Sequence, residues 1–376
     1  MYKKKIIFLT GTRADYGKLK PLIFSTLKSK RFETSIIATG MHLQKLYGYT
    51  YIEIKKDFGK IKIYKMFNQK KIDPMHVVLS KTIKTLDKTL KSIKPDLVVI
   101  HGDRVETLAA SIYCNLNNIL IAHIEGGEVS GTVDESLRHS TTKLSHIHFT
   151  SNVKAKNVLR RMGEIKKNIY VIGSPEVDIM LKKNLPTLNE MQNRYNIKFN
   201  KYLILLFHPV TTLKKKDVEH QCRQLFEAIK KSLKNFIIIY PNNDTFSEII
   251  FKYINKFRYK SNFKILPSMK FEYFQTLLKH SECIIGNSSA GIREAPVYGV
   301  KTINLGNRQK NRTDNKSIVN LDFKKNLILK ELKKIRKIKN KKVFDFGLGN
   351  SGKKFIKILN TNKFWKTDRQ KYFSKI

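Results

Sequence analysis

Short apolar runs recur along the chain, and each is followed by a polar, glycine-containing turn and then by a helical pattern. Within a run, Ile, Leu and Val stand next to one another without alternating with polar residues. This is typical of strands buried on both faces, and therefore of parallel sheets covered by helices. The alternation of strands and helices predicts a doubly wound α/β architecture. The predicted strands are 5–10, 35–39, 96–100, 119–124, 146–150, 169–172, 202–207, 235–240, 282–286 and 301–305.

The strands form two series, which separate near residues 185–190. A length of 376 residues exceeds what one hydrophobic core usually serves, so we expect two domains. We predict a Rossmann-like domain over 1–184, a Rossmann-like nucleotide-binding domain over 185–350, and a last helix within 351–376. Because open α/β sheets bind ligands beyond the carboxyl ends of their strands, two facing sheets would direct their polar loops into one cleft.

The composition is strongly basic, with 74 Lys and Arg residues against 30 Asp and Glu residues. Most lysines are spread along helical patterns such as 79–94, opposite Leu and Ile, which predicts solvated helix faces. No aromatic RNA-binding box, zinc-finger spacing or arginine-rich arm is present, so we expect no nucleic-acid partner. Single cysteines at 114, 222 and 283 indicate a reduced, cytoplasmic setting. No apolar run approaches the roughly 20 residues of a membrane span, so we expect no membrane partner.

Carboxylates gather in one region that is out of character with this basic chain. No lysine occurs between Lys94 and Lys143. A capping box formed by Thr132 and Glu135 predicts a helix that starts at Val133. Its apolar pattern predicts a core-facing stripe of Leu137, Thr141, Leu144 and His148. The six carboxylates of the region are Asp103, Glu106, Glu125, Glu128, Asp134 and Glu135.

Three of these carboxylates are candidates for proton transfer. Asp103 and Glu125 each follow a predicted strand, and Asp134 shares a helix face with Arg138, four residues on, which can orient a carboxylate. Scattered salt bridges are the alternative, but lysine, the usual partner, is missing here. Mutual repulsion and burial would raise the pKa of some of these groups toward the working range. The region lacks paired His or Cys ligands, so we predict no essential metal.

Phosphate binding is predicted first at the end of the first strand. Gly11 allows a tight turn, and Arg13 then stands at the start of a helix, where a phosphate is favoured. An ordinary turn with a surface arginine explains this motif equally well. It is not the GxGxxG fingerprint, so a nicotinamide cofactor is disfavoured.

A second phosphate site is predicted after residues 282–286. Ser288 and Ser289 open a helix whose free N–H groups would bind an anion, and Glu294 could accept hydrogen bonds from ribose hydroxyls. A plain serine N-cap is the alternative. The nucleotide interpretation is favoured because further polar residues follow neighbouring strands, namely Asn242, Asp244 and Arg308.

His208 ends the strand 202–207 and precedes Pro209. A single histidine at a strand end is often structural. In a ligand-binding cleft it would serve as a phosphate ligand or general acid.

Six ordered motifs occur within residues 5–315, namely GTRADYGKL, HGDR, HIEGGEVSGTVDESLRH, HPVTT, GNSSAGIRE and NLGNRQ. Together they resemble the hydrolysing UDP-N-acetylglucosamine 2-epimerases of sialic-acid biosynthesis. The resemblance implies a glycosyltransferase-B-like fold of two Rossmann-like domains facing a cleft, with the last helix packed on the first domain. It also implies elimination of UDP from UDP-N-acetylglucosamine to a glycal, followed by hydration to N-acetylmannosamine. Neither a cofactor nor a metal is implied, and a homodimer or homotetramer is expected.

The resemblance also implies residue roles. Asp103, Glu125 and Asp134 would transfer protons, with Arg138 holding them in register. His208 would meet the diphosphate and could protonate the leaving group. Arg13, Ser288 and Ser289 would bind phosphates, and Glu294 and Arg308 would bind the ribose and neighbouring groups. The full set of expected substrate-binding residues is Arg13, Arg104, Asn242, Asp244, Ser288, Ser289, Glu294 and Arg308.

Two alternatives remain at this stage. A related branch performs the same reaction on a nucleotide-linked 2,4-diacetamido-2,4,6-trideoxyglucose in legionaminic-acid synthesis, and it shares every quoted motif. A glycosyltransferase of the same fold would need an acceptor pocket and fewer carboxylates, so Asp103, Glu125 and Asp134 argue against it.

Overall fold

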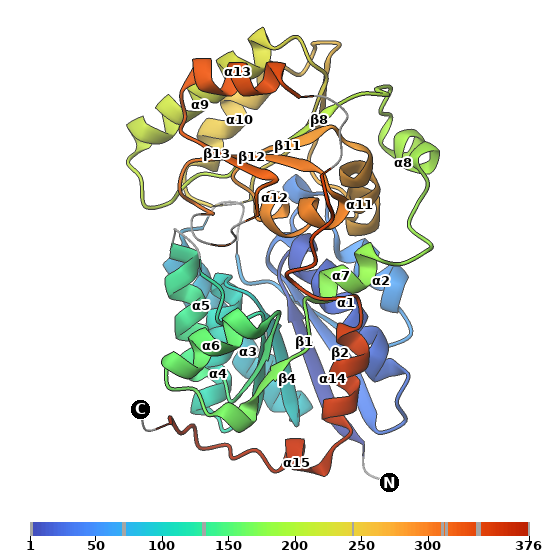
Figure 1. The fold of residues 1–376 in the computed structure, drawn as a ribbon. Helices are drawn as coiled ribbons and strands as arrows, with labels where there is room; N and C mark the ends of the chain where they lie inside the picture. The colour runs from blue at the N-terminus through green and yellow to red at the C-terminus, as the bar shows by residue number, and fades with distance from the viewer. Residues whose placement is uncertain are drawn as a thin grey trace. The chain divides into compact units, whose positions relative to one another are not determined.

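The computed structural model describes residues 3–69, 73–129, 133–242, 244–309, 312, 315–335 and 340–374. The chain divides into two compact units, which are shown in Figure 1. Unit 1 consists of Met1–Glu128, Asp134–Lys182 and Phe346–Ile376. Unit 2 consists of Val129–Val133 and Lys183–Asp345. The C-terminal segment of the chain thus belongs to the same unit as the N-terminus.

Unit 1 is built on a parallel sheet of seven strands in the order β3-β2-β1-β4-β5-β6-β7. The first three strands wind one way from β1 and the last four wind the other way, so the strand order reverses between β1 and β4. Ile6 and Phe8 pack on one face of the sheet, and Ile7 and Leu9 pack on the other. The strands are β1 Lys4–Thr10, β2 Phe32–Thr39, β3 Ile63–Met66, β4 Leu97–His101, β5 Ile121–Ile124, β6 Ile147–Thr150 and β7 Ile169–Val171.

Helices cover both faces of this sheet (Figure 1). The C-terminal helix α14 packs against α1 and α7, and Phe355 of α14 joins the apolar core beside Phe8. Asp178 accepts hydrogen bonds from the main-chain N–H groups of Ser351 and Gly352, at 2.9 and 2.8 Å, and so caps α14. The helices are α1 Arg13–Leu27, α2 Tyr51–Phe58, α3 Met75–Ile93, α4 Val105–Leu116, α5 Val133–Leu144, α6 Val153–Arg161, α7 Pro175–Met180, α14 Ser351–Leu359 and α15 Asn362–Trp365, with short 3-10 turns η1 Gly40–Leu43, η2 Lys45–Tyr47 and η3 Lys166–Asn168.

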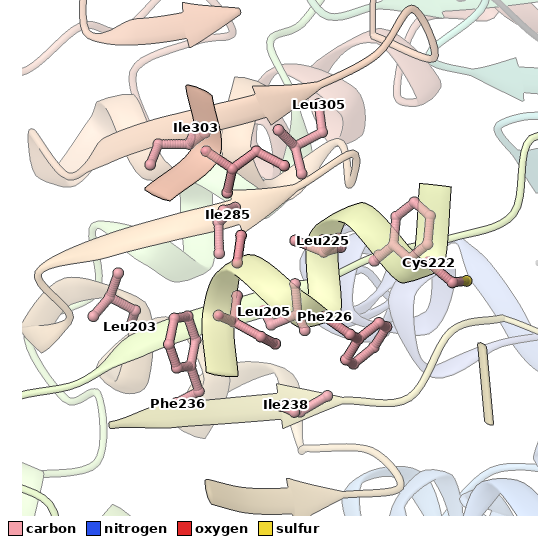
Figure 2. Packing of buried hydrophobic residues seen from close by; sticks show 14 of the residues in the cluster. Leu203, Leu205, Cys222, Leu225, Phe226, Phe236, Ile238, Ile285, Ile303 and Leu305 are labelled. Atoms are coloured by element: carbon pink, nitrogen blue, oxygen red, sulfur yellow. The ribbon is translucent and has the colours of Figure 1, made fainter. Parts of the chain in front are cut away.

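Unit 2 contains a parallel sheet of six strands in the order β10-β9-β8-β11-β12-β13. Its apolar core lies between the central strands and α9, where Leu205 and Ile238 of the sheet meet Leu225 and Phe226 of the helix (Figure 2). The strands are β8 Leu203–Leu206, β9 Phe236–Ile239, β10 Phe263–Leu266, β11 Cys283–Gly286, β12 Lys301–Leu305 and β13 Ile318–Leu321. The helices are α8 Leu188–Tyr195, α9 Lys215–Lys231, α10 Ser247–Asn255, α11 Phe271–His280, α12 Ala290–Arg293 and α13 Lys325–Lys333, with the 3-10 turn η4 Ala295–Tyr298.

The predicted fold class, α/β with two doubly wound Rossmann-like units, is confirmed. Each of the ten predicted strands is present, but β3, β10 and β13 were not predicted. All three are edge strands, and each has positions that are only partly buried. Their sequences therefore mix polar and apolar residues and lack the continuous apolar run that marks a central strand. None of the helices that the structure describes is both long and apolar enough to cross a membrane.

Candidate active site

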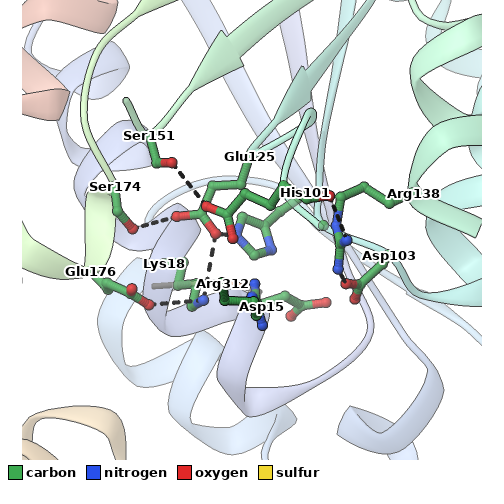
Figure 3. Close-up of polar contacts among 12 residues, drawn as sticks. Asp15, Lys18, His101, Asp103, Glu125, Arg138, Ser151, Ser174, Glu176 and Arg312 are labelled. Atoms are coloured by element: carbon green, nitrogen blue, oxygen red, sulfur yellow. Dashed lines mark hydrogen bonds and ion pairs between the residues drawn. The ribbon is translucent and has the colours of Figure 1, made fainter. Parts of the chain in front are cut away.

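Glu125 lies at the centre of a polar cluster in unit 1. It follows β5 directly, its side chain is buried, and its backbone is left-handed with φ of 65°, a conformation that residues other than glycine rarely adopt. Its Oε2 atom lies 3.0 Å from His101 Nε2 and 3.5 Å from Lys18 Nζ. Its Oε1 atom accepts a hydrogen bond from the Ser174 hydroxyl (Figure 3). Three elements thus fix the position of one buried carboxylate, as an acid/base group requires.

Lys18 connects Glu125 to a second buried carboxylate. Its ammonium group lies 2.8 Å from Oε2 of Glu176, which is fully buried in α7. Lys18 itself is largely buried in α1. One cation therefore neutralises charge on two carboxylates that enter the site from β5 and α7 (Figure 3).

Arg138 and Asp103 form the second part of the cluster. Arg138 lies on α5 and is only 3% exposed, while the Asp103 side chain is 29% exposed. The guanidinium donates to Oδ2 of Asp103 and, at 2.8 Å, to the carbonyl oxygen of Glu128 (Figure 3). Burial disfavours the Arg138 cation, but Asp103, Glu128 and Asp134 outweigh it and raise its pKa. Arg138 thus stays charged, holds Asp103 and interacts with Asp134.

The helix that carries Asp134 and Arg138 covers Val133–Leu144. The predicted capping residue Thr132 lies outside the described residues. The predicted core-facing stripe was largely wrong: on α5 only Thr141 of the stripe is buried, Leu137 and Leu144 are partly exposed, and the helix ends at Leu144, so that His148 lies on β6. A histidine on a buried strand met the helical spacing by chance, since the intervening turn is only two residues long.

His123 fixes the position of the loop that carries Asp103. The Nε2 atom of His123 lies 2.7 Å from the carbonyl oxygen of Gly102, and its Nδ1 atom lies 3.2 Å from the Thr142 hydroxyl. Burial lowers the pKa of His123 to about 3, despite the hydrogen bond to Gly102. His123 is therefore neutral at physiological pH and supports the loop without adding charge to the site.

Two arginines of unit 1 were predicted to bind substrate. Arg13 begins α1, and its guanidinium pairs with Glu53 of α2, with Nε 3.1 Å from Oε2. Arg104 is the N-cap residue of α4, directly after Asp103. Both residues follow strands of unit 1, as predicted, but the structure places Arg13 in an ion pair with another element. A role in phosphate binding stays a prediction for both.

In unit 2, the end of β11 allows a close approach of two strands. Gly286 has φ of +134°, and a Cβ atom there would lie only 1.9 Å from the carbonyl oxygen of Leu206. Only glycine fits this position. The next residue, Asn287, is fully buried and exchanges two 2.8 Å hydrogen bonds with the main chain of His208. The two strand ends are thereby locked together.

His208 has a defined tautomer because of its neighbours. The main-chain N–H of Asn242 donates to its Nδ1 atom at 3.2 Å, so the neutral ring carries its proton on Nε2. Arg308 donates at 3.1 Å to the carbonyl oxygen of Asn287. The structure thus brings His208, Asn242 and Arg308 together around Asn287. The Nε2–H group of His208 and the guanidinium of Arg308 are both hydrogen-bond donors, and such a pair suits an anionic ligand.

The remaining predicted residues of unit 2 lie close in sequence to this group. Ser288 accepts a hydrogen bond from the N–H of Ala290 at 3.3 Å, whereas the Ser289 side chain makes no capping bond to α12. The helix is only four residues long and continues as a 3-10 turn, so its dipole is small. Glu294 is buried, and Asp244 precedes α10. No ligand role is assigned to these residues by the geometry alone.

Sequence reasoning assigned no role to several residues that organise the site. His101 is the first letter of the HGDR motif, and Ser174 and Lys18 lie in the GSP and GTRADYGKL segments. Asn287 belongs to the GNSSAGIRE motif but was given no role. His101, Lys18 and Asn287 lie inside recognised motifs, so membership of a motif was the available signal for them, whereas Ser174 lies outside all six motifs. Their partners are far away in sequence, and pairing therefore could not be deduced.

Comparison with known proteins assigns the family. Residues 25–360 match the family model described as UDP-N-acetylglucosamine 2-epimerase. The chain is 43% identical over 374 residues to a UDP-N-acetylglucosamine 2-epimerase from Neisseria meningitidis serogroup B, and the match covers 98% of each protein. It is 32% identical over 364 residues to a hydrolysing UDP-N,N'-diacetylbacillosamine 2-epimerase from Legionella pneumophila, which covers 95% of this chain and 96% of the relative.

A solved structure has the same fold. The Methanocaldococcus jannaschii UDP-GlcNAc 2-epimerase in complex with UDP-GlcNAc and UDP aligns with a TM-score of 0.81, over 94% of this chain and 99% of that one, at 24% identity. The two doubly wound units are those of an enzyme class with a glycosyltransferase-B-like fold. The chain belongs to the UDP-N-acetylglucosamine 2-epimerase family. The family resemblance of the six motifs is thereby confirmed.

Proposed function

We propose that the protein is a hydrolysing 2-epimerase that converts UDP-N-acetylglucosamine and water to N-acetylmannosamine and UDP. Family membership and the 43% identity to the Neisseria enzyme support the substrate. The observation that carries the proton chemistry is the buried Glu125 carboxylate with its three side-chain partners, next to the Asp103–Arg138 pair. Such fixed carboxylates suit proton transfer at a sugar carbon.

The proposed reaction has two steps that balance in protons. In the first, a carboxylate removes the proton from C2 while the bond between C1 and the UDP oxygen breaks, which gives a glycal and UDP. In the second, water adds its hydroxyl to C1, and C2 receives a proton on the opposite face. Asp103, Glu125 and Asp134 share these transfers, and Arg138 holds Asp103 in place. The two reaction steps involve no net oxidation or reduction, so they require no redox cofactor.

Unit 2 would bind the nucleotide. The Nε2–H group of His208 would donate to the diphosphate and could protonate the departing oxygen. Ser288, Ser289 and Arg308 would add donors to the phosphates, and Glu294 would accept from ribose hydroxyls. The fixed tautomer of His208 supports this role, because the proton already lies on the nitrogen that is not bonded to Asn242.

A second substrate is favoured by a specific finding. The Legionella relative, named for a hydrolysing reaction on UDP-N,N'-diacetylbacillosamine, is 32% identical over nearly the whole chain. The same site could act on a nucleotide-linked 2,4-diacetamido-2,4,6-trideoxyglucose, because elimination involves only C1 and C2. The two sugars differ at C4 and C6, away from the reacting atoms.

The test is to incubate the purified protein with UDP-N-acetylglucosamine in deuterated water and to follow the products by NMR. We expect UDP and free N-acetylmannosamine with deuterium at C2. A UDP-linked epimer without free sugar would instead indicate the non-hydrolysing reaction. A parallel incubation with the UDP-linked diacetamido sugar, compared by kcat/KM, decides between the two substrates.

A further inference from the structure

A buried carboxylate beside the proposed active site has no role in the chemistry described above. Glu106 lies in the first turn of α4, three residues after Asp103, and is only 2% exposed. Its side chain reaches back toward the ends of β1 and β2. Its carboxyl carbon lies 3.4 Å from the point that a Cβ on Gly11 would occupy. Its Oε1 atom lies 2.7 Å from the corresponding point on Gly40.

The Glu106 carboxylate differs from the carboxylates of Asp15 and Glu125, which are also buried in unit 1. Asp15 accepts hydrogen bonds from the N–H groups of Gly11 and Thr12, at 3.0 and 3.1 Å, and Glu125 contacts three donor side chains. By contrast, none of the residues that the structure describes donates a hydrogen bond to the buried Oε2 of Glu106. Leaving a buried carboxylate oxygen without a hydrogen-bond donor is costly, because the oxygen has lost its contacts with water. Because no residue in the described part of the chain supplies that donor, Oε2 is available to a hydrogen-bond donor from a ligand.

The position of Glu106 indicates which kind of partner fits. It lies where the strand order of the sheet reverses, next to the loops that follow β1 and β4, where open α/β sheets bind ligands. Gly11 and Gly40 present only main chain to the carboxylate, and a side chain at position 40 would collide with it. A metal ion would need further ligands, and no suitable group of three His, Cys, Asp or Glu side chains occurs in the described part of the chain. One carboxylate bordered by main chain suits a neutral hydrogen-bond donor.

We propose that Glu106 accepts a hydrogen bond from a hydroxyl or amide N–H group of the sugar and so selects the sugar of the substrate. This inference rests on the proposed function, because it requires a nucleotide sugar in the site. Glu106 is a specificity-determining residue in this proposal and takes no part in proton transfer. A site that is built to accept from one donor rejects a sugar that lacks it, because the buried acceptor is then left without a partner.

The experiment compares wild-type protein with Glu106→Met, which keeps the length of the side chain and removes the acceptor. The substrates are UDP-N-acetylglucosamine, its 3-deoxy, 4-deoxy and 6-deoxy analogues, and an analogue with a 2-O-acetyl ester in place of the amide. We expect kcat/KM for the parent sugar to fall about 10²-fold in the variant, as for loss of a hydrogen bond to a charged group. One analogue should be about 10²-fold worse than the parent for the wild type and nearly equal to it for the variant.

Two controls separate this proposal from a structural role and from failure of the proposed function. Glu248→Met makes the same change in the first turn of α10, where the side chain is exposed, and should leave kcat/KM unchanged. The Tm of ligand-free Glu106→Met should equal or exceed that of the wild type, because an unpaired buried charge is removed. A Tm several degrees lower would overturn the inference whatever the activity. If the wild type turns over the parent sugar nucleotide but every analogue loses the same factor in kcat/KM in wild type and variant, the inference about Glu106 is wrong and the proposed function stands. A wild type that is inactive on both sugar nucleotides would refute the proposed function as well.

Discussion

The two units position their polar residues by different means. In unit 1, side chains hold side chains: Glu125 contacts Lys18, His101 and Ser174, and Arg138 holds Asp103. In unit 2, the central contact is between a side chain and main chain, because Asn287 bonds both main-chain groups of His208. The carboxylates therefore lie in a network of charges, whereas the histidine lies in a rigid loop junction.

This difference fits a division of labour. A group that gains and loses a proton needs neighbours that adjust its proton affinity, and charged side chains do this most strongly. A group that binds a diphosphate needs mainly a fixed direction, which main-chain hydrogen bonds provide at little cost in side-chain entropy. Substitutions in unit 1 should therefore change turnover, and those in unit 2 should change nucleotide affinity.

The largest effect is expected for the carboxylates of unit 1. Asp103→Asn, Glu125→Gln and Asp134→Asn should each lower kcat by at least about 10²-fold, because an amide cannot exchange the proton. The affinity for free UDP, measured by calorimetry, should stay close to that of the wild type. This follows because UDP lacks the sugar on which the carboxylates act.

Glu135→Gln is the matched control for this series. Glu135 is adjacent to Asp134 on α5, is partly exposed and lies 3.5 Å from His139, outside the Asp103–Arg138 pair, and its replacement should leave kcat unchanged. Full activity in any one of the three carboxylate variants would remove that residue from the proton transfers. Loss of UDP affinity equal to the loss of kcat would argue against the division between the units.

A smaller effect is expected for Asn287→Ala in unit 2. The substitution leaves two buried main-chain groups of His208 without partners, each at a cost of about 1–3 kcal/mol. The His208 ring then loses its fixed direction, and we expect UDP affinity to fall about 30-fold, which corresponds to about 2 kcal/mol. Isothermal titration calorimetry with UDP measures the affinity, and thermal unfolding measures the stability.

Asn304→Ala separates lost stability from lost orientation. Asn304 is buried on β12 and donates to Asn320 at 2.8 Å, so its replacement also removes an amide hydrogen bond from unit 2. We expect a lower Tm with UDP affinity nearly unchanged. An equal loss of affinity in both variants would show that general destabilisation, and not the position of His208, weakens nucleotide binding.

The fold could be predicted where burial leaves a clear mark in the sequence. Central strands such as β4 and β9 are covered on both faces and read as continuous apolar runs. The edge strand β13 has Asn320 exposed within Ile318–Leu321, so hydrophobicity alone does not separate it from a loop. The order of the strands within each sheet is set by contacts between distant segments, so it leaves no signal in the local sequence.

Candidate site residues could be named one at a time, but their partners could not. Glu125 and Asp103 follow strands, which made them visible. Lys18 lies 107 residues from Glu125, and nothing in its own segment marks it as the partner of a carboxylate. The Arg13–Glu53 pair likewise joins two helices whose packing the sequence does not specify. Long-range pairing is a property of the folded chain.

The units should also differ in their response to acid. In unit 1, burial lowers the pKa of His42 to about 4 and that of His123 to about 3, and it also lowers the pKa of His148. The ordinary pKa of histidine in an unfolded chain is about 6.5. Below that pH the unfolded chain binds protons that folded unit 1 does not, so its stability falls as pH decreases toward 4.

His42 and His123 should each lower the stability of unit 1 by about 1.4 kcal/mol per pH unit, or about tenfold in the unfolding equilibrium, between pH 6 and pH 4.5. The buried cysteines report on each unit separately, because Cys114 lies in unit 1 and Cys222 and Cys283 lie in unit 2. Labelling with 4,4'-dithiodipyridine across a urea series should show the Cys114 midpoint moving to lower urea in acid, ahead of the other two. His220→Gln, at an exposed site on α9, should not change this difference. If the urea midpoints of all three cysteines shift in parallel, the buried histidines of unit 1 do not cause the acid sensitivity. If only the Cys114 midpoint shifts, the histidines of unit 1 account for the difference between the units.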